Sequence, residues 1–278
     1  MKYQPSLPDR NDNVSHQQPV REFIILLLGV VGLAMLSFWI LGLFVDQAIE
    51  YIAPEDEARL FAKLDLEWEF EEMASPEQHA SVQTIIDNLR SCHDLPFTPK
   101  VTVIKSDGIN AMALPGGSII VFSGLLNSLQ SENGLTFVLA HELGHFKNRD
   151  HLRSMGRGLV LAALSTLLTG ANSSISQMLA STMTLGVAKY SQGRESKADE
   201  TALQILNCHY GHVGGATELF EVLKTQQGSW GFGMLHYFDS HPELQKRIEA
   251  IHKMGKKQDY QTRETTKLGN RFTIQDAR

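Results

Sequence analysis

An uncharged run near the N-terminus sets the first limit on the architecture of this chain. Phe23 to Val45 contains no charged residue. As a helix this run would be about 34 Å long, which is enough to cross the hydrocarbon core of a bilayer. The run is longer than the apolar core of a typical signal peptide, and Asp46 to Glu50 offers no small-residue cleavage site. We therefore expect a retained transmembrane helix at 23–45, preceded by a disordered arm at 1–22.

The basic residues that flank this run favour one orientation in the membrane. Lys2, Arg10 and Arg21 precede it, whereas Arg59 is the first basic residue beyond it. Because basic residues are retained on the cytoplasmic side, this bias predicts an N-terminus inside the cell. The bulk of the chain is then expected outside the cytoplasm.

The composition limits the classes of partner and the redox chemistry. The 278 residues leave room for one large domain or two small ones, and the net charge of −6 gives no electrostatic basis for binding nucleic acid. Cys92 and Cys208 are too few for a disulfide scaffold and lack metal-ligand spacing. They could form one bridge in an oxidising compartment, or they could be two unrelated buried thiols.

The chemistry is concentrated in the sequence His141-Glu142-Leu143-Gly144-His145. On a helix, His141 and His145 share a face and can direct both imidazoles at one Zn²⁺ ion. Glu142 could then take a proton from a water molecule at the ion. Ser131 is a candidate N-cap for this helix. The competing interpretation, an amphipathic helix with two surface histidines, leaves Glu142 unexplained.

A small β-sheet is predicted just before this helix. Pro99 to Lys105 and Ser118 to Ser123 have strand patterns, and Asn110 to Gly117 reads as a short strand that ends in a turn. Pro115 suits an edge position, because proline cannot donate a hydrogen bond to a neighbouring strand. An extended peptide could add to such an edge and present its carbonyl to the metal. A plain hairpin that packs on the helix is equally consistent with these residues.

Two apolar stretches and one acidic pair follow the motif. Gly158 to Gly170 and Ile175 to Val187 are short for a membrane crossing, so we expect a helical hairpin at 158–187 that is buried or dips into the membrane surface. Glu195 and Asp199 are four residues apart and can share a helix face. One could bind the metal while the other accepts the outer ring N–H of a ligand histidine.

Residues 255–278 are polar and are expected to form a disordered tail.

Four of these stretches together resemble one known family. In the same order, Asn110 to Gly117, the His141 to His145 motif, Glu195 to Asp199, and Ser240-His241-Pro242 with Arg247 are similar to the HtpX-like and CAAX-prenyl-protease-like membrane zinc metallopeptidases, of the gluzincin type. The resemblance covers roughly residues 50–253, within a metallopeptidase domain expected at 50–254. The single predicted anchor makes it closest to single-anchored bacterial members that face the periplasm.

The resemblance implies a fold and a set of roles. It implies a mainly α-helical domain with a small β-sheet, of the α+β zincin type, and one Zn²⁺ per chain. It also implies a general base, Glu142, and a supporting acid, Asp199, with His241 and Arg247 stabilising charge in the transition state. The implied metal ligands are His141, His145 and Glu195, and the implied substrate strand consists of Asn110, Ala111, Met112, Ala113 and Leu114.

We therefore predict a membrane-anchored zinc endopeptidase that acts in protein quality control. Its expected partners are the lipid bilayer and protein or peptide substrates, such as misfolded envelope proteins. The alternative is a non-proteolytic, chaperone-like membrane protein that retains the zinc site, and intact Glu142 argues against it because a structural zinc needs no carboxylate there. The sequence leaves the oligomeric state open.

Overall fold

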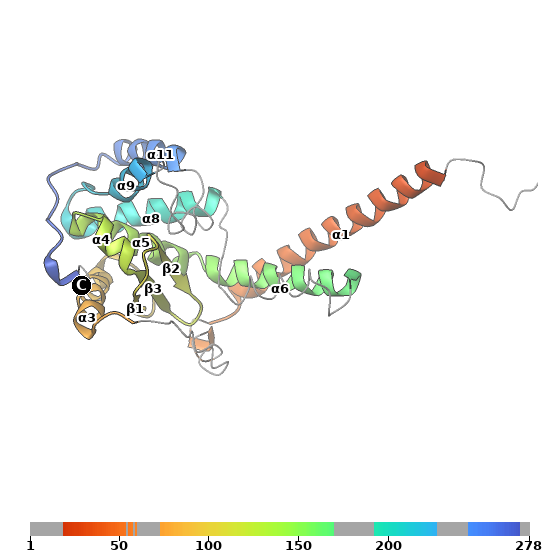
Figure 1. The fold of residues 1–278 in the computed structure, drawn as a ribbon, viewed down its shortest axis with the longest axis horizontal. Coiled ribbons are helices and arrows are strands. Elements are labelled where there is room, and N and C mark those ends of the chain that lie inside the picture. Colours follow the sequence, from red (N-terminus) through yellow and green to blue (C-terminus); the bar gives the residue numbers. More distant parts are fainter. Residues whose placement is uncertain are drawn as a thin grey trace, which may run out of the picture.

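The computed structural model describes residues 19–53, 55–57, 59, 73–169, 192–226 and 244–272. A long N-terminal helix leads into a mainly helical domain with one small sheet, which confirms the predicted fold class (Figure 1). The α-helices are α1 (Pro19–Glu50), α3 (Pro76–Asn88), α4 (Ser123–Ser128), α5 (Glu132–Lys147), α6 (Asp150–Thr169), α8 (Gln192–Tyr210), α9 (Glu218–Gln226) and α11 (Leu244–Lys257). The strands are β1 (Lys100–Ile104), β2 (Ala111–Leu114) and β3 (Ser118–Phe122), and the 3-10 helices are η1 (Leu89–Cys92) and η2 (Asn270–Phe272).

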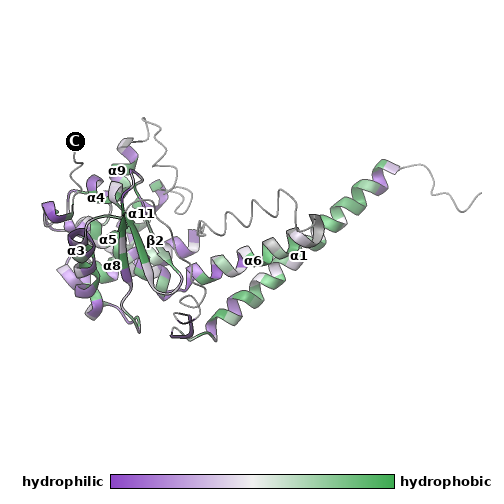
Figure 2. Cartoon of the chain, turned by 60° about the horizontal axis from the view of Figure 1, so that its bottom comes forward, coloured by the Kyte–Doolittle hydropathy of each residue, from purple (hydrophilic) through white to green (hydrophobic). Residues whose placement is uncertain are grey.

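Helix α1 is long and apolar enough to cross a membrane. It extends beyond the predicted 23–45 span at both ends, and its 32 residues correspond to a length of about 48 Å. It projects away from the domain, and its apolar side chains are exposed along most of its length (Figure 2). Such a surface is unfavourable in water and is what a bilayer would cover.

The three predicted strands form one sheet in the order β1-β3-β2. Strand β1 runs parallel to β3, whereas β2 runs antiparallel to it and lies at the edge. The Phe122 N–H donates to the Asn110 carbonyl at 3.0 Å, and antiparallel pairing alternates from that point. The backbone groups of Ala111 and Ala113 therefore face the open edge, as an edge strand for peptide addition requires.

Helix α5 runs through the core of the domain. Its cap is the predicted one, because the Ser131 hydroxyl accepts a hydrogen bond from the Gly134 N–H at 2.9 Å. Every residue from Asn133 to Phe146 is buried. Gly144 allows α8 to approach α5 closely, since a Cβ at this position would lie 2.8 Å from the Ala198 Cα. This close contact brings the acids of α8 next to the histidines of α5.

Helix α6 leaves the domain beside α1 (Figures 1 and 2). A Cβ at Gly156 would lie 2.5 Å from a methyl group of Val45, so this glycine permits the contact between the two helices. The first half of the predicted hairpin, from Gly158, forms the second part of α6. Its second half, Ile175 to Val187, lies outside the described residues, so the hairpin remains a prediction.

The segment after α11 corrects one expectation. Residues 258–272 do not form a disordered tail but pack along the domain, with the Leu268 N–H donating to the Gln130 carbonyl and the Glu132 N–H to the Thr266 carbonyl, each at 2.8 Å. Phe272 is fully buried next to α3. The expectation was wrong because backbone hydrogen bonds and two apolar contacts hold a segment whose average composition is polar.

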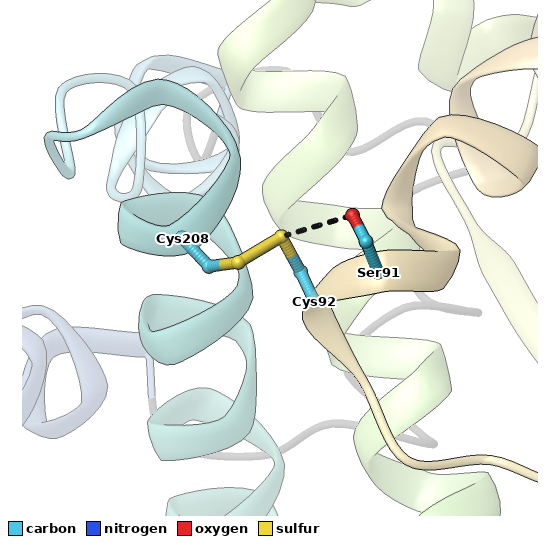
Figure 3. The surroundings of a disulfide bond; sticks show 3 residues. All are labelled: Ser91, Cys92 and Cys208. Atoms are coloured by element: carbon cyan, nitrogen blue, oxygen red, sulfur yellow. Dashed lines mark hydrogen bonds between the residues drawn. A yellow bond between two sulfur atoms is a disulfide. The ribbon is translucent and has the colours of Figure 1, made fainter.

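Cys92 and Cys208 form a disulfide that connects η1 to α8 (Figure 3). Their Cα atoms lie 5.7 Å apart, and 116 positions separate them in the sequence. Of the two possibilities that the sequence left open, the structure contains the bridge. It joins the helix that carries Glu195 to the 3-10 turn that follows α3.

Candidate metal centre

Two histidines on α5 meet in the interior of the domain. His141 and His145 are both buried, and their Nε2 atoms lie 3.0 Å apart. One helical turn separates them, so both side chains leave α5 on the same face. The surface-helix interpretation of the motif therefore fails, because neither ring reaches solvent.

Helix α8 supplies the third candidate ligand. The Glu195 carboxylate lies 3.5 Å from His141 Nε2 and 3.4 Å from His145 Nε2, and the three ligand atoms are within 4.8 Å of one another. Tetrahedral zinc with bonds of about 2.0–2.1 Å needs ligand atoms about 3.3 Å apart. The spacing and the two-nitrogen, one-oxygen donor set thus fit a small divalent metal, and the structure brings all three predicted ligands together.

The outer nitrogens of the two histidines face two aspartates. His141 Nδ1 lies 2.9 Å from Asp199, the predicted supporting acid, and His145 Nδ1 lies 3.0 Å from Asp150. Both contacts use the outer nitrogens, so the Nε2 atoms are the ones that would face a metal, as is usual for ligand histidines. Sequence reasoning missed Asp150, because it follows the end of α5 and does not share a helix face with His145. The backbone at Arg149 is in the left-handed region, with φ 55°, and this turns the chain so that Asp150 lies next to His145. No sequence pattern predicted this turn.

Arg247 lies in the site, as the sequence predicted, and it contacts acids there. Its guanidinium lies 2.7 Å from Glu195, and 2.6 and 2.9 Å from the two oxygens of Asp199. It also stacks over the Phe220 ring at 4.7 Å. All these groups are buried, so Arg247 offsets the charge of two carboxylates in the interior of the domain. His241 lies outside the described residues, and its place in the site stays a prediction.

The two histidines have opposite electrostatic environments. Burial and the Arg247 charge lower the pKa of His141, against the hydrogen bond to Asp199. Burial also opposes a charge on His145, yet hydrogen bonds to Asp150 and Glu195 prevail and raise its pKa to about 9. Burial alone would raise the pKa of Asp199, but Arg247 and His141 lower it. The site thus keeps Asp199 ionised beside a neutral His141.

Glu142 lies between α5 and the edge strand. Its side chain is buried, and its Oε2 accepts a hydrogen bond from the Ala113 N–H at 2.8 Å. This N–H belongs to the open edge of β2, so the predicted base and the predicted substrate strand lie side by side. Within the described part of the chain, the buried Oδ1 of Asn110 has no hydrogen-bond partner.

Two histidines and a glutamate around one point, with a second glutamate at a strand edge, define a metallopeptidase type of site. The comparisons with known proteins agree: the model of peptidase family M48 matches residues 76–255. The chain belongs to this family.

Named relatives support this assignment. The chain is 30% identical to metalloprotease YcaL of Escherichia coli (strain K12), over 54% of this chain and 59% of that protein. It is 31% identical to a protease HtpX homolog of Fusobacterium nucleatum, over 66% of this chain and 72% of that protein. It is also 31% identical to mitochondrial metalloendopeptidase OMA1 of Schizosaccharomyces pombe, over 54% of this chain and 44% of that protein. The chain thus spans about half the length of two of these relatives, YcaL and OMA1.

Proposed function

We propose that this protein is a membrane-anchored zinc endopeptidase, with one Zn²⁺ held by His141, His145 and Glu195. The observation that carries the proposal is the convergence of these three buried ligands with Glu142 at the open edge of β2. Two imidazoles and a carboxylate with room for water are the donor set of catalytic zinc. When bound, the metal would supply a water molecule of lowered pKa and polarise the scissile carbonyl.

The residues of the chain would perform the remaining steps. Strand β2 would hold an extended peptide through the outward backbone groups of Ala111 and the carbonyl of Ala113, because the Ala113 N–H is already bound to Glu142. Glu142 would accept a proton from the attacking water and deliver it to the leaving amine. The Ala113 N–H already donates to the Glu142 carboxylate at 2.8 Å, so strand β2 would position both the base and the bound peptide. His241 would donate to the carbonyl oxygen, or cap the site in a resting state.

The location and the substrates are part of the same proposal. The Cys92–Cys208 bridge supports an oxidising compartment, in agreement with the basic residues that precede α1. A catalytic domain outside the cytoplasm would meet envelope proteins, and one relative, from Yersinia pestis, is named beta-barrel assembly-enhancing protease. We propose misfolded envelope proteins as substrates, cleaved close to the bilayer that holds α1. Alkaline phosphatase fused after Arg278 should be active in a bacterial host, and an active cytoplasmic reporter at that point would reverse the orientation.

The decisive test compares wild type with Glu142→Gln. The variant should retain zinc and lose casein hydrolysis, because Glu142 lies beside a ligand without being one. Glu249→Gln is the matched control, since Glu249 is exposed on α11 and should leave both properties unchanged. Near-normal proteolysis by Glu142→Gln would refute the assigned base, and a wild-type protein that binds zinc without cleaving protein would favour the chaperone-like alternative.

A second test concerns His241. Its replacement by alanine should lower kcat about ten- to a thousandfold with zinc retained, as expected for loss of a donor to the oxyanion. A rise in activity would identify His241 as an inhibitory cap instead. Unchanged kinetics would remove this residue from the mechanism.

A further inference from the structure

The acid that supports His145 is itself held on both of its oxygens. Asp150 Oδ2 accepts from His145 Nδ1 at 3.0 Å, and Asp150 Oδ1 forms an ion pair with Arg194 Nε at 3.3 Å. Only 2% of Asp150 is exposed. A buried carboxylate with two fixed partners cannot rotate freely, so the direction of the His145 ring depends on Arg194 as well as on Asp150.

Arg194 connects three helices at this point. It belongs to the first turn of α8, immediately before Glu195. Its Nη1 donates to the Ser154 hydroxyl of α6 at 3.1 Å, and its Nη2 lies 3.9 Å from Asp46 of α1. A cation in the first turn of a helix opposes the helix dipole. Asp150 of α6 and Asp46 of α1 offset that cost. A simple surface charge would not need these two partners.

Asp46 is the first charged residue after the apolar run of α1. Besides Arg194, it forms an ion pair with Arg157 and lies 3.6 Å from Arg153, both on α6. The contacts lead from the end of the membrane anchor, through Asp46, Arg194 and Asp150, to a candidate metal ligand. Every step is an ion pair or a hydrogen bond. Asp46 and Arg194 are partly exposed, whereas Asp150 and His145 are buried.

We propose that Arg194 is a positioning residue for the metal centre and that Asp46 holds it there, so that the membrane anchor contributes to metal affinity. This inference rests on the proposed zinc site. Loss of Arg194 leaves one oxygen of a buried carboxylate without its cationic partner, which is costly and allows the carboxylate to turn. Loss of Asp46 frees one end of the guanidinium, and its effect on zinc is smaller because it acts through Arg194.

The test measures zinc affinity of the full-length apoprotein in detergent by competition with a chelator. Arg194→Met keeps the length of the side chain but removes its charge, and it should weaken zinc binding about three- to tenfold, below the 10–100-fold typical of a direct partner of a ligand. Asp46→Asn should weaken it about two- to threefold by the same argument. Arg194→Lys should lie between wild type and Arg194→Met, because lysine can reach one acid but has no fork to bridge two.

Glu50→Gln is the matched control. Glu50 lies one turn beyond Asp46 on α1 and pairs with Arg153 at 3.5 Å, not with Arg194. The Glu50→Gln variant should therefore bind zinc with the same affinity as the wild type. In addition, Asp46→Asn should have no further effect in an Arg194→Met background, and Co²⁺ bound to Arg194→Met should give a visible spectrum that differs from that of the wild type.

Each outcome decides a separate point. Wild-type zinc affinity in Arg194→Met overturns the inference while leaving the proposed protease intact, provided that Glu142→Gln still abolishes hydrolysis. Equal losses in Asp46→Asn and Glu50→Gln also overturn it, because they would reflect general damage to α1. If Arg194→Met does not fold, Asp46→Asn and Arg194→Lys carry the same test. A wild-type protein that binds no zinc overturns both proposals.

Discussion

The two sides of the metal site use the same chemistry but lead to different parts of the molecule. His141 is supported by Asp199, which Arg247 contacts, and His145 is supported by Asp150, which Arg194 contacts. The first series of contacts ends in the interior of the domain, where only 6% of the Arg247 side chain is exposed. The second ends at α1, and 18% of the Arg194 side chain is exposed. One support is thus buried within the domain, and the other depends on how the domain contacts α1.

The largest difference is expected between the two arginines. Arg247→Met would leave Glu195 and Asp199 without a buried cation, which should destabilise the apoprotein by about 3–5 kcal/mol. Arg194→Met should cost less, because water can replace part of its contacts. Denaturant unfolding of both apoproteins measures the difference, and saturating zinc should restore part of the loss in Arg247→Met. Equal losses in the two variants would contradict the comparison.

A second link on the membrane side predicts a pH dependence. Glu57 accepts from His151 at 2.8 Å, from Arg149 at 3.1 Å and from the Gly116 N–H at 3.2 Å, and Arg149 also donates to the Ile49 carbonyl at the end of α1. Burial alone would raise the pKa of Glu57, but the hydrogen bonds and the charge of His151 lower it from 4.5 to about 2. The link therefore joins the anchor to the turn after β2.

Because the pKa of Glu57 is lower in the folded state, its contribution to stability is complete above about pH 4.5 and is lost as the pH falls towards 2. The contribution should be on the order of 2–3 kcal/mol. Unfolding of wild type and Glu57→Gln across this range measures it, and their difference in stability should shrink as the pH falls. Glu55→Gln, at an exposed neighbouring position, should follow the wild type. A constant difference would show that Glu57 acts only through packing.

The smallest effect is expected when Asp46→Asn is combined with a change at one of the supporting aspartates. Asp150→Asn and Asp199→Asn should each weaken zinc binding about 10–100-fold, and Glu195→Gln, which removes a proposed ligand, should weaken it more. Adding Asp46→Asn should weaken binding further in the Asp199→Asn protein but not in the Asp150→Asn protein. An equal effect in both backgrounds would mean that α1 is not connected to one side alone.

Local signals were sufficient wherever the relevant contacts lie within one helix or strand. The spacing of His141 and His145, the cap at Ser131 and the uncharged run of α1 all depend on helix geometry, and the structure agrees with each. Pro115 and the alternating strands likewise predicted β2 at an edge. The expectation of a disordered tail failed because it used average composition, whereas Phe272 and a few backbone hydrogen bonds were enough to hold the segment.

Helical and strand periodicity are properties of neighbouring residues, so they were enough to predict the apolar helix α1, the histidine pair, the position of Glu142 and the candidates Glu195 and Asp199. The groups that support these residues could be found only in the folded protein. Asp150 reaches His145 through a left-handed residue at Arg149, and Glu195 does so because Gly144 lets α8 approach α5. Arg194 and Asp46 meet where the end of α1 lies next to the first turns of α6 and α8. These contacts join residues far apart in the chain, and no local pattern records such distances.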